Sequence, residues 1–328
     1  MSSDAFNPTG EYQPESTVDL PPMFAWPPRP IQVLKYLLFD MFYPWGYLFI
    51  GFAFISWYFL TPSLEAMAVF APGWMALIWL RNAFWLILIA GGLHWWLYMR
   101  RGQESFTKYH DRWLATDNQA FLWGDQVRDN MFWSIVSGVT ICTAWEVVTY
   151  WIYANGRVTI PGLDTNPIYF IACVYGVFIW GTIHFYLGHR LLHWQPLYKI
   201  SHELHHRNMN TGPWTGVSMH PIEHLVYFSV FPLLWLVPVH PVIIPLLSLY
   251  MLVGPAPSHC GFDYLQFKGV RFPTGEWFHQ LHHQYFNFNY GNTLSPLDKL
   301  FGSWHDGSKE SLQAQKNRMK SLRRKTAD

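Results

Sequence analysis

Four long apolar segments limit what this chain can fold into. They cover residues 33–60, 74–99, 131–153 and 167–188, and each supplies the roughly 20 apolar residues that a helix needs to cross a bilayer. A large soluble helical core is the alternative, but these segments are apolar on every side and too long for ordinary buried helices. The sequence therefore predicts an all-α, integral-membrane helical bundle with four spanning helices. Arg81, inside the second segment, marks either where that segment enters the lipid or a polar contact within the bundle.

The composition supports a membrane protein and excludes some functions. Only 13% of the 328 residues are charged, against about a quarter in a typical soluble domain, and 19 are tryptophan. The formal net charge of +1 gives no electrostatic case for a nucleic-acid partner. The three cysteines, Cys142, Cys173 and Cys260, form no CxxC motif, so neither a disulfide framework nor a thiolate metal site is indicated.

Loop charges predict the orientation in the membrane. The 61–73 loop has no lysine or arginine, the 154–166 loop has only Arg157, and the 100–130 loop has five basic residues: Arg100, Arg101, Lys108, Arg112 and Arg128. Because basic loops stay on the cytoplasmic side, we expect the N-terminus there, and four crossings return the chain to that side just before His189.

A fifth apolar region, residues 225–254, is broken by prolines at positions 232, 238, 241 and 245. This density of proline favours two shorter helices over one straight span. We interpret the region as a helical hairpin that enters and leaves on the cytoplasmic side. Residues 1–30 are interpreted as a disordered or extended segment, 31–307 as the membrane domain, and 308–328 as a basic tail that is solvated or touches membrane lipids.

Twelve of the 16 histidines fall between His189 and His283, and most of these form three clusters. The clusters occupy residues 189–193 (HRLLH), 202–206 (HELHH) and 279–283 (HQLHH). Positions three and four apart share a helix face, so each cluster can direct two or three imidazoles to one point. Neutral imidazole is the commonest metal ligand in proteins, and eight imidazoles exceed the four of a tetrahedral zinc site. The pattern predicts a cytoplasmic-side, histidine-rich dimetal cap; separate surface or core histidines are the alternative.

These motifs resemble the fatty acid hydroxylase superfamily, the membrane group of sterol desaturases, sterol C4-methyl oxidases and lipid hydroxylases. The similarity covers about residues 170–305. Residues 188–193 (GHRLLH) and 198–206 (YKISHELHH) match the HxxxH and HxxHH boxes, and 220–223 (HPIE) and 258–262 (SHCGF) match sterol-type elements. The last box and its C-terminal signature match 278–283 (FHQLHH), 289–291 (NYG) and 297–302 (LDKLFG).

The resemblance implies two iron ions and O2 as co-substrate; sequence alone allows zinc, iron, copper or nickel. It carries metal-ligand roles onto nine residues: His189, His193, His202, His205, His206, His259, His279, His282 and His283.

Five further residues are predicted to be ligands or partners of ligands. His220 fits either role. Asp263 stands where some relatives have another histidine, and is an oxygen ligand or an acceptor that orients an imidazole. His184 stands where many members have an aspartate. Glu203 and Glu223 are expected to accept hydrogen bonds from ligating imidazoles.

The stretch 124–130 (GDQVRDN) is unusually polar for the start of a membrane helix. It is interpreted as a helix cap supplied by Asp129 or Asn130, or as a surface that contacts substrate or partner.

The function predicted is a membrane-bound diiron oxygenase that hydroxylates or desaturates a lipid, either sterol-like or fatty-acyl. No flavin site, haem domain or dinucleotide motif is found, so an external electron donor (a ferredoxin, cytochrome or reductase) is expected. The alternatives are a metal transporter or metal-binding membrane protein, and a metal-dependent membrane hydrolase with Glu203 as the base.

Overall fold

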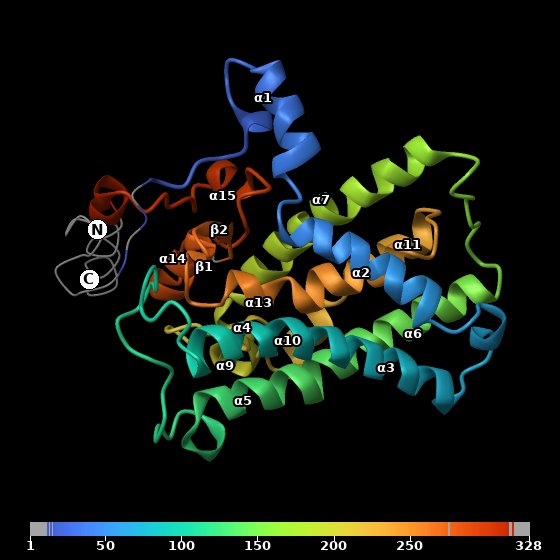
Figure 1. Cartoon of the computed structure of the whole chain (residues 1–328), viewed down its shortest axis with the longest axis horizontal. Coiled ribbons are helices and arrows are strands. Elements are labelled where there is room, and N and C mark those ends of the chain that lie inside the picture. Colours follow the sequence, from blue (N-terminus) through green and yellow to red (C-terminus); the bar gives the residue numbers. More distant parts are fainter. Residues whose placement is uncertain (1–11, 13, 15, 275, 315–316, 318–328) are drawn as a thin grey trace.

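The computed structural model describes all residues except 1–11, 13, 15, 275, 315–316 and 318–328. Much of the predicted N-terminal segment and most of the predicted basic tail therefore lie outside the described residues. The described part is mostly helical. Its long helices run side by side; the loops after α2 and α6 lie at one end of the bundle, and α9 and α14 lie at the other (Figure 1).

Among the described residues, three helices are long and apolar enough to cross a membrane, and they correspond to three of the four predicted spans. The first, Pro72–Met99, contains α3 (Pro72–Leu86) and α4 (Gly92–His94) joined by π-helical turns. The second, Gln126–Ala154, contains α5 (Gln126–Phe132) and α6 (Thr140–Ala154). The third is α7 (Pro167–Leu192), whose 26 residues extend about 39 Å at about 1.5 Å per residue. Proline at its first position and the Asn166 side chain at its N-cap fix where it starts.

The first apolar segment differs from the prediction because it is not one straight helix. It forms α1 (Pro30–Lys35), which continues as a π-helical turn to Asp40, and α2 (Trp45–Phe59), with a bend of 45° between them. Pro44 lies in the break, where its missing N–H and fixed ring disfavour a continuous helix. The described residues thus contain three candidate spans, or four if the bent pair counts as one.

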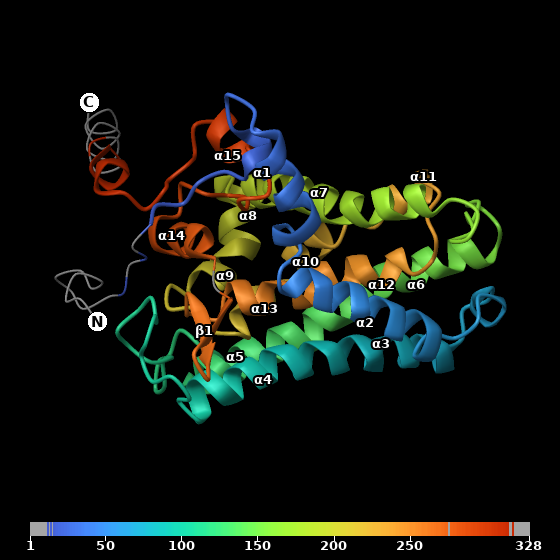
Figure 2. The same cartoon turned by 45° about the horizontal axis from the view of Figure 1, so that its top comes forward.

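The proline-broken region forms short helices inside the bundle. The chain passes through α10 (Pro221–Tyr227) and α11 (Leu233–Leu236), then turns back through α12 (Ile243–Ser248) and α13 (Pro255–Ser258). It thus goes out from the histidine-bearing end and returns to it (Figure 2). All six residues of α12 are buried, and this helix packs against α2, α6 and α7. How this excursion lies in a bilayer, and hence the predicted hairpin, stays a prediction.

The histidine-bearing end consists of short elements. These are α8 (Gln195–Leu197), α9 (Glu203–His206), α14 (Trp277–Tyr285), α15 (Leu297–Leu300) and the antiparallel strands β1 (Tyr264–Phe267) and β2 (Val270–Pro273). The strands correct the all-α prediction in one detail. Lys268 and Gly269 join them with φ angles of 47° and 84°, the left-handed conformation that a two-residue hairpin turn requires.

A buried ion pair ties α3 to α6. Arg81 pairs with Glu146, and their side chains are only 2% and 0% exposed. Arg81 Nη1 also donates to Thr61 Oγ1 at 2.7 Å, and Asn82 Nδ2 donates to the second Glu146 oxygen at 2.9 Å. Of the two interpretations of Arg81, the structure therefore supports the contact within the bundle.

Replacing Glu146 by leucine should lower the free energy of unfolding by about 3–5 kcal/mol, because it leaves the Arg81 charge buried without a partner. The double variant Arg81→Leu/Glu146→Leu should recover much of this loss. Thermal unfolding in detergent micelles measures both effects. Arg128→Ala is the control: its side chain is 73% exposed and lies 3.9 Å from Asp125. A Glu146→Leu loss no larger than that of the control would contradict the role of the pair.

Candidate metal centre

Four segments bring the predicted ligands to one end of the bundle. The last turn of α7 carries His189, and His193 follows directly after that helix. The segment leading into α9 carries His202, and α9 itself carries His205 and His206. The residue after α13 is His259, and α14 carries the final three: His279, His282 and His283.

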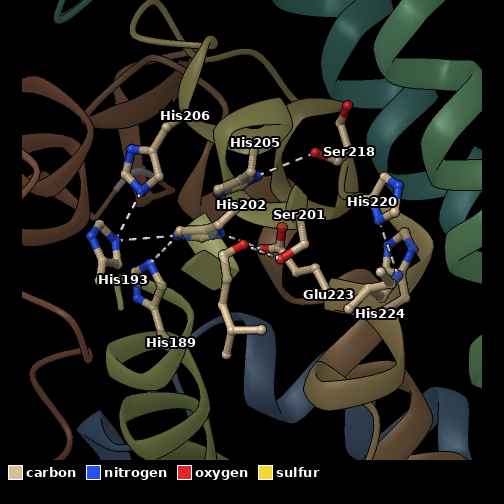
Figure 3. Close-up of polar contacts among 12 residues, drawn as sticks. His189, His193, Ser201, His202, His205, His206, Ser218, His220, Glu223 and His224 are labelled. Atoms are coloured by element: carbon tan, nitrogen blue, oxygen red, sulfur yellow. Dashed lines mark hydrogen bonds and ion pairs between the residues drawn. The ribbon is translucent and has the colours of Figure 1, made fainter. Parts of the chain in front are cut away.

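All nine predicted ligands come together, and they separate into two groups. The five-histidine group comprises His189, His193, His202, His206 and His282; the four-histidine group comprises His205, His259, His279 and His283. Within each group, one nitrogen from each ring lies within 4.8 Å of the others. The α9 cluster contributes to both groups, because His202 and His206 are four residues apart on one face while His205 points to the other (Figure 3).

The inner nitrogens of the five-histidine group have the spacing of ligands around one ion. Nε2 atoms lie 3.0 Å apart in the pairs His189–His202 and His206–His282. His193 Nε2 is 3.1 Å from His206 Nε2 and 3.2 Å from those of His202 and His282. Ligand nitrogens at about 2.1 Å from a metal and at right angles to one another are about 3.0 Å apart. Shared protons cannot satisfy five converging nitrogens, so the site fits a cation.

Acceptors hold the outer nitrogens of three histidines of this group. His189 Nδ1 donates to Tyr290 O at 2.6 Å, and His282 Nδ1 donates to Phe288 O at 2.5 Å. His202 Nδ1 donates to Glu223 Oε1 at 2.7 Å. Because a carbonyl or carboxylate oxygen only accepts, Nδ1 carries the proton and the Nε2 lone pair faces inward. This is the tautomer that a ligating histidine needs.

The four-histidine group shows the same chemistry through nitrogens that lack partners. His279 and His283 are 3% and 0% exposed, and neither ring nitrogen of either residue has a hydrogen-bond partner among the described residues. His259 Nδ1 donates to Pro255 O at 2.9 Å, which leaves Nε2 unpaired in the same part of the chain. Buried, unpaired polar atoms are costly, and a second cation would satisfy them.

Burial also keeps these imidazoles in the ligating form. It lowers the pKa of His193 and His259 to about 3, with the nearby His205 lowering both further, and it lowers the pKa of His205 to about 4. The rings are therefore neutral at neutral pH, as metal binding requires.

The other five predicted residues lie in different places. Glu223 is 1% exposed and orients His202, as expected. Glu203 is exposed, so it does not accept a hydrogen bond from one of the buried imidazoles. His220 caps α10 by accepting from Ile222 N at 3.2 Å, Asp263 accepts from Tyr12 and Tyr109, and His184 contacts Ser229; none of these three belongs to either group.

The polar stretch before α5 does cap that helix, but through a different residue. The side chain of Asp125 accepts from Arg128 N at 2.9 Å, so the assignment of the cap to Asp129 or Asn130 is wrong. Asp129 instead binds Arg207 at 2.5 Å, and Asn130 donates to Asn208 at 3.0 Å. Both side chains therefore fasten α5 to the segment that follows α9.

The loop after α14 supplies contacts that sequence analysis missed. Asp298 accepts from Tyr290 N at 2.9 Å and from Gly291 N at 2.7 Å, which fixes the loop whose carbonyls hold His189 and His282. The NYG and LDKLFG motifs were visible in the sequence, but backbone carbonyl acceptors leave no side-chain signal.

A cavity of about 340 Å³ reaches the four-histidine group. Its lining includes His205, His259 and His279, together with apolar and aromatic side chains: Met41, Trp45, Phe185, Met219, Tyr227, Met251 and Leu294. The lining also includes Tyr36, Asp40 and Tyr43, from the bent segment before α2.

Comparison with known proteins places this site in a family. A profile of the fatty acid hydroxylase family matches residues 174–303, which include every histidine of both groups. The predicted resemblance to the fatty acid hydroxylase superfamily is thus confirmed over this segment. No solved structure matches the chain.

Three curated relatives illustrate the similarity. A Delta(7)-sterol 5(6)-desaturase of Eremothecium gossypii is 34% identical over 38% of this chain and 35% of its own length. The corresponding desaturase of Saccharomyces cerevisiae is 32% identical over 36% of this chain and 32% of its own. A putative methylsterol monooxygenase of Dictyostelium discoideum is 31% identical over 45% of this chain and 55% of its own. The chain thus spans about a third of the length of the two desaturases.

Removing the Glu223 carboxylate should weaken metal binding by about 10–100-fold, because His202 loses the acceptor that fixes its tautomer and direction. The measurement is metal affinity of purified Glu223→Ala protein by competition with a chelator. Glu203→Ala is the matched control, since that carboxylate is exposed. Equal affinity of the two variants would show that the Glu223 contact does not support the site.

Proposed function

We propose that this protein is a membrane-bound non-haem diiron oxygenase that hydroxylates or desaturates a C–H bond of a lipid, using O2 and electrons from an external donor. One observation carries the proposal: two groups of buried imidazoles lie side by side, and the second opens into a cavity with largely apolar walls. The relatives named as sterol desaturases and as a methylsterol monooxygenase support lipid oxidation as the reaction class.

The nine histidines would hold the two irons, five in one group and four in the other. When bound, the irons would supply the activation of O2. The chain's own residues do the rest. Glu223 and the carbonyls of Phe288 and Tyr290 hold three imidazoles in place, while Trp45 and Phe185 give the cavity walls that exclude water from a lipid.

The alternatives receive less support from the geometry. Glu203, the residue predicted to be the base of a hydrolase, is exposed and so does not reach the buried histidine groups. A transporter would place its ionisable groups within the spans. Within the candidate spans, the buried pair Arg81–Glu146 is already hydrogen-bonded to Thr61 and Asn82. The histidine-bearing helices α9 and α14 instead lie at the end of the bundle (Figure 1).

Purified protein expressed with iron should contain about two irons per chain and consume O2 when a reductant and a lipid substrate are supplied. His282→Ala and His283→Ala each remove an imidazole from a different group, so each should lower the iron content and abolish turnover. His110→Ala, which lies outside both groups, is the control. Iron analysis and mass spectrometry of added sterols, fatty acids and a small water-soluble amine give the result. Folded protein that binds at most one metal, or that oxidises only the amine, would overturn the proposal.

We also propose that the histidine groups face the cytoplasm, because the basic 100–130 loop lies at the same end as the groups. Tyr109 N donates to Gly261 O at 3.0 Å, which fastens that loop beside His259. A cysteine introduced at the exposed Thr159 should react with an impermeant reagent from outside, and one at Met209, 54% exposed, should not. Labelling of intact cells measures this, with permeabilised cells as the control. The reverse pattern would refute the orientation.

A further inference from the structure

Glu276 places a carboxylate on the wall of the cavity beside the four-histidine group. It lies three residues before His279, at the N-cap of α14, so both residues lie on one side of that helix. Thr293 N donates to its Oε1 at 3.1 Å, which fixes the carboxylate in one orientation. Its Oε2 has no hydrogen-bond partner among the described residues, and it is not among the buried unpaired atoms, so it is open to the cavity.

The surrounding lining selects what this oxygen can bind. Glu276 and Asp40 are the only carboxylates among the described residues that line the cavity, and neither lysine nor arginine is among them. Asp40 belongs to the bent segment before α2. A neutral lipid group with an O–H would therefore find a carboxylate acceptor at Glu276.

Glu276 is not the only polar side chain among the described residues of the cavity lining. Tyr250 hydroxyl lies 3.0 Å from Thr182 Oγ1, and Asn292 Nδ2 donates to that Oγ1 at 3.2 Å. Tyr250 and Asn292 both line the cavity, as does Thr293. Apolar groups also line the cavity, including Trp45, Met219 and Met251. The cavity is thus matched to an amphiphile with a small, uncharged polar group and an apolar body.

We propose that Glu276 is a specificity-determining residue that accepts a hydrogen bond from a hydroxyl group of the lipid substrate and holds it beside the four-histidine group. This proposal rests on the proposed function, because it takes the cavity to be where the lipid binds. It adds a hydrogen-bond acceptor for the substrate and a prediction of selectivity: alcohols bind in preference to ethers of the same skeleton.

The experiment measures binding to the iron-loaded, full-length protein without O2 or reductant, so it does not depend on turnover. The probes are cholesterol and oleyl alcohol, each compared with its methyl ether. Binding is measured under mildly alkaline conditions, because burial raises the pKa of Glu276 to about 7. At least one alcohol should bind about tenfold or more tightly than its ether, since only the alcohol donates to an ionised carboxylate.

Three variants assign the effect to a residue. Glu276→Gln keeps an oxygen for Thr293 N but presents an N–H to the cavity, so the ether should gain and the preference for the alcohol should fall to about onefold to threefold. Asp40→Asn changes another carboxyl group of the cavity lining and Glu203→Gln changes one outside it, and both should keep the preference of the unchanged protein. Iron content of each variant shows that the site is intact.

The outcomes separate this proposal from the proposed function. Equal binding of alcohol and ether by the unchanged protein, or a preference that Asp40→Asn removes and Glu276→Gln keeps, would overturn the role of Glu276 even if lipid oxidation were observed. A preference for the alcohol that only Glu276→Gln removes would support the role of Glu276. This holds even if the protein binds the alcohols and oxidises no lipid, because that failure would count against the proposed function alone.

Discussion

Nine imidazole rings packed within a few ångströms of one another are the interaction on which this end of the molecule depends. Neutral imidazoles do not attract one another through their Nε2 lone pairs, so the rings of the five-histidine group are together only because the chain holds them there. Burial makes protonation unfavourable, which prevents mutual charge repulsion and leaves the lone pairs available. Bonds from these nitrogens to a shared cation would offset the free energy that each ring loses when it leaves water. Binding of the cation would therefore stabilise the fold as well as serve the chemistry.

The hold on the rings comes from outside each cluster. His189 at the end of α7 donates to Tyr290, and His282 on α14 donates to Phe288, so one loop fastens two helices that are far apart in the sequence. Asp298 binds two backbone N–H groups of that loop, and it is itself fixed by Ser303 at 2.7 Å. These contacts fix the loop whose carbonyls hold His189 and His282, so the C-terminal signature has a structural purpose apart from any ligand.

The sequence predicted the members of the site better than their arrangement. Spacings of three and four residues can be recognised without a structure because side chains on a helix repeat with that period. The division into five and four cannot, since it depends on His205 turning away from His202 and His206 on the same short helix. Likewise, Glu223 was recognisable as a carboxylate near the second cluster, whereas the carbonyls of Phe288 and Tyr290 were not, because every residue has one.

The same limit applies to the fold. Hydropathy located the helices Pro72–Met99, Gln126–Ala154 and Pro167–Leu192, because a run of about 20 apolar residues can be recognised in the sequence itself. It could not locate the bend at Pro44, where the apolar character continues without interruption, nor the β1–β2 hairpin, whose ten residues carry only a Lys268–Gly269 turn signal. Apolar content shows that a segment favours a hydrophobic environment, but the direction of that segment is decided by backbone geometry and packing.

The unpredicted bend has a consequence for access to the site. A straight helix over residues 33–60 would continue along the bundle, whereas the 45° bend turns α1 away from it (Figure 2). The bent segment places Tyr36, Asp40 and Tyr43 on the cavity lining and leaves Ile31 and Phe39 85% and 61% exposed. Such exposed apolar side chains are favourable in lipid and unfavourable in water. If α1 rests in the membrane surface, the part of the cavity lined by Tyr36, Asp40 and Tyr43 lies beside the lipid. A molecule dissolved in the bilayer can then reach the four-histidine group without crossing water.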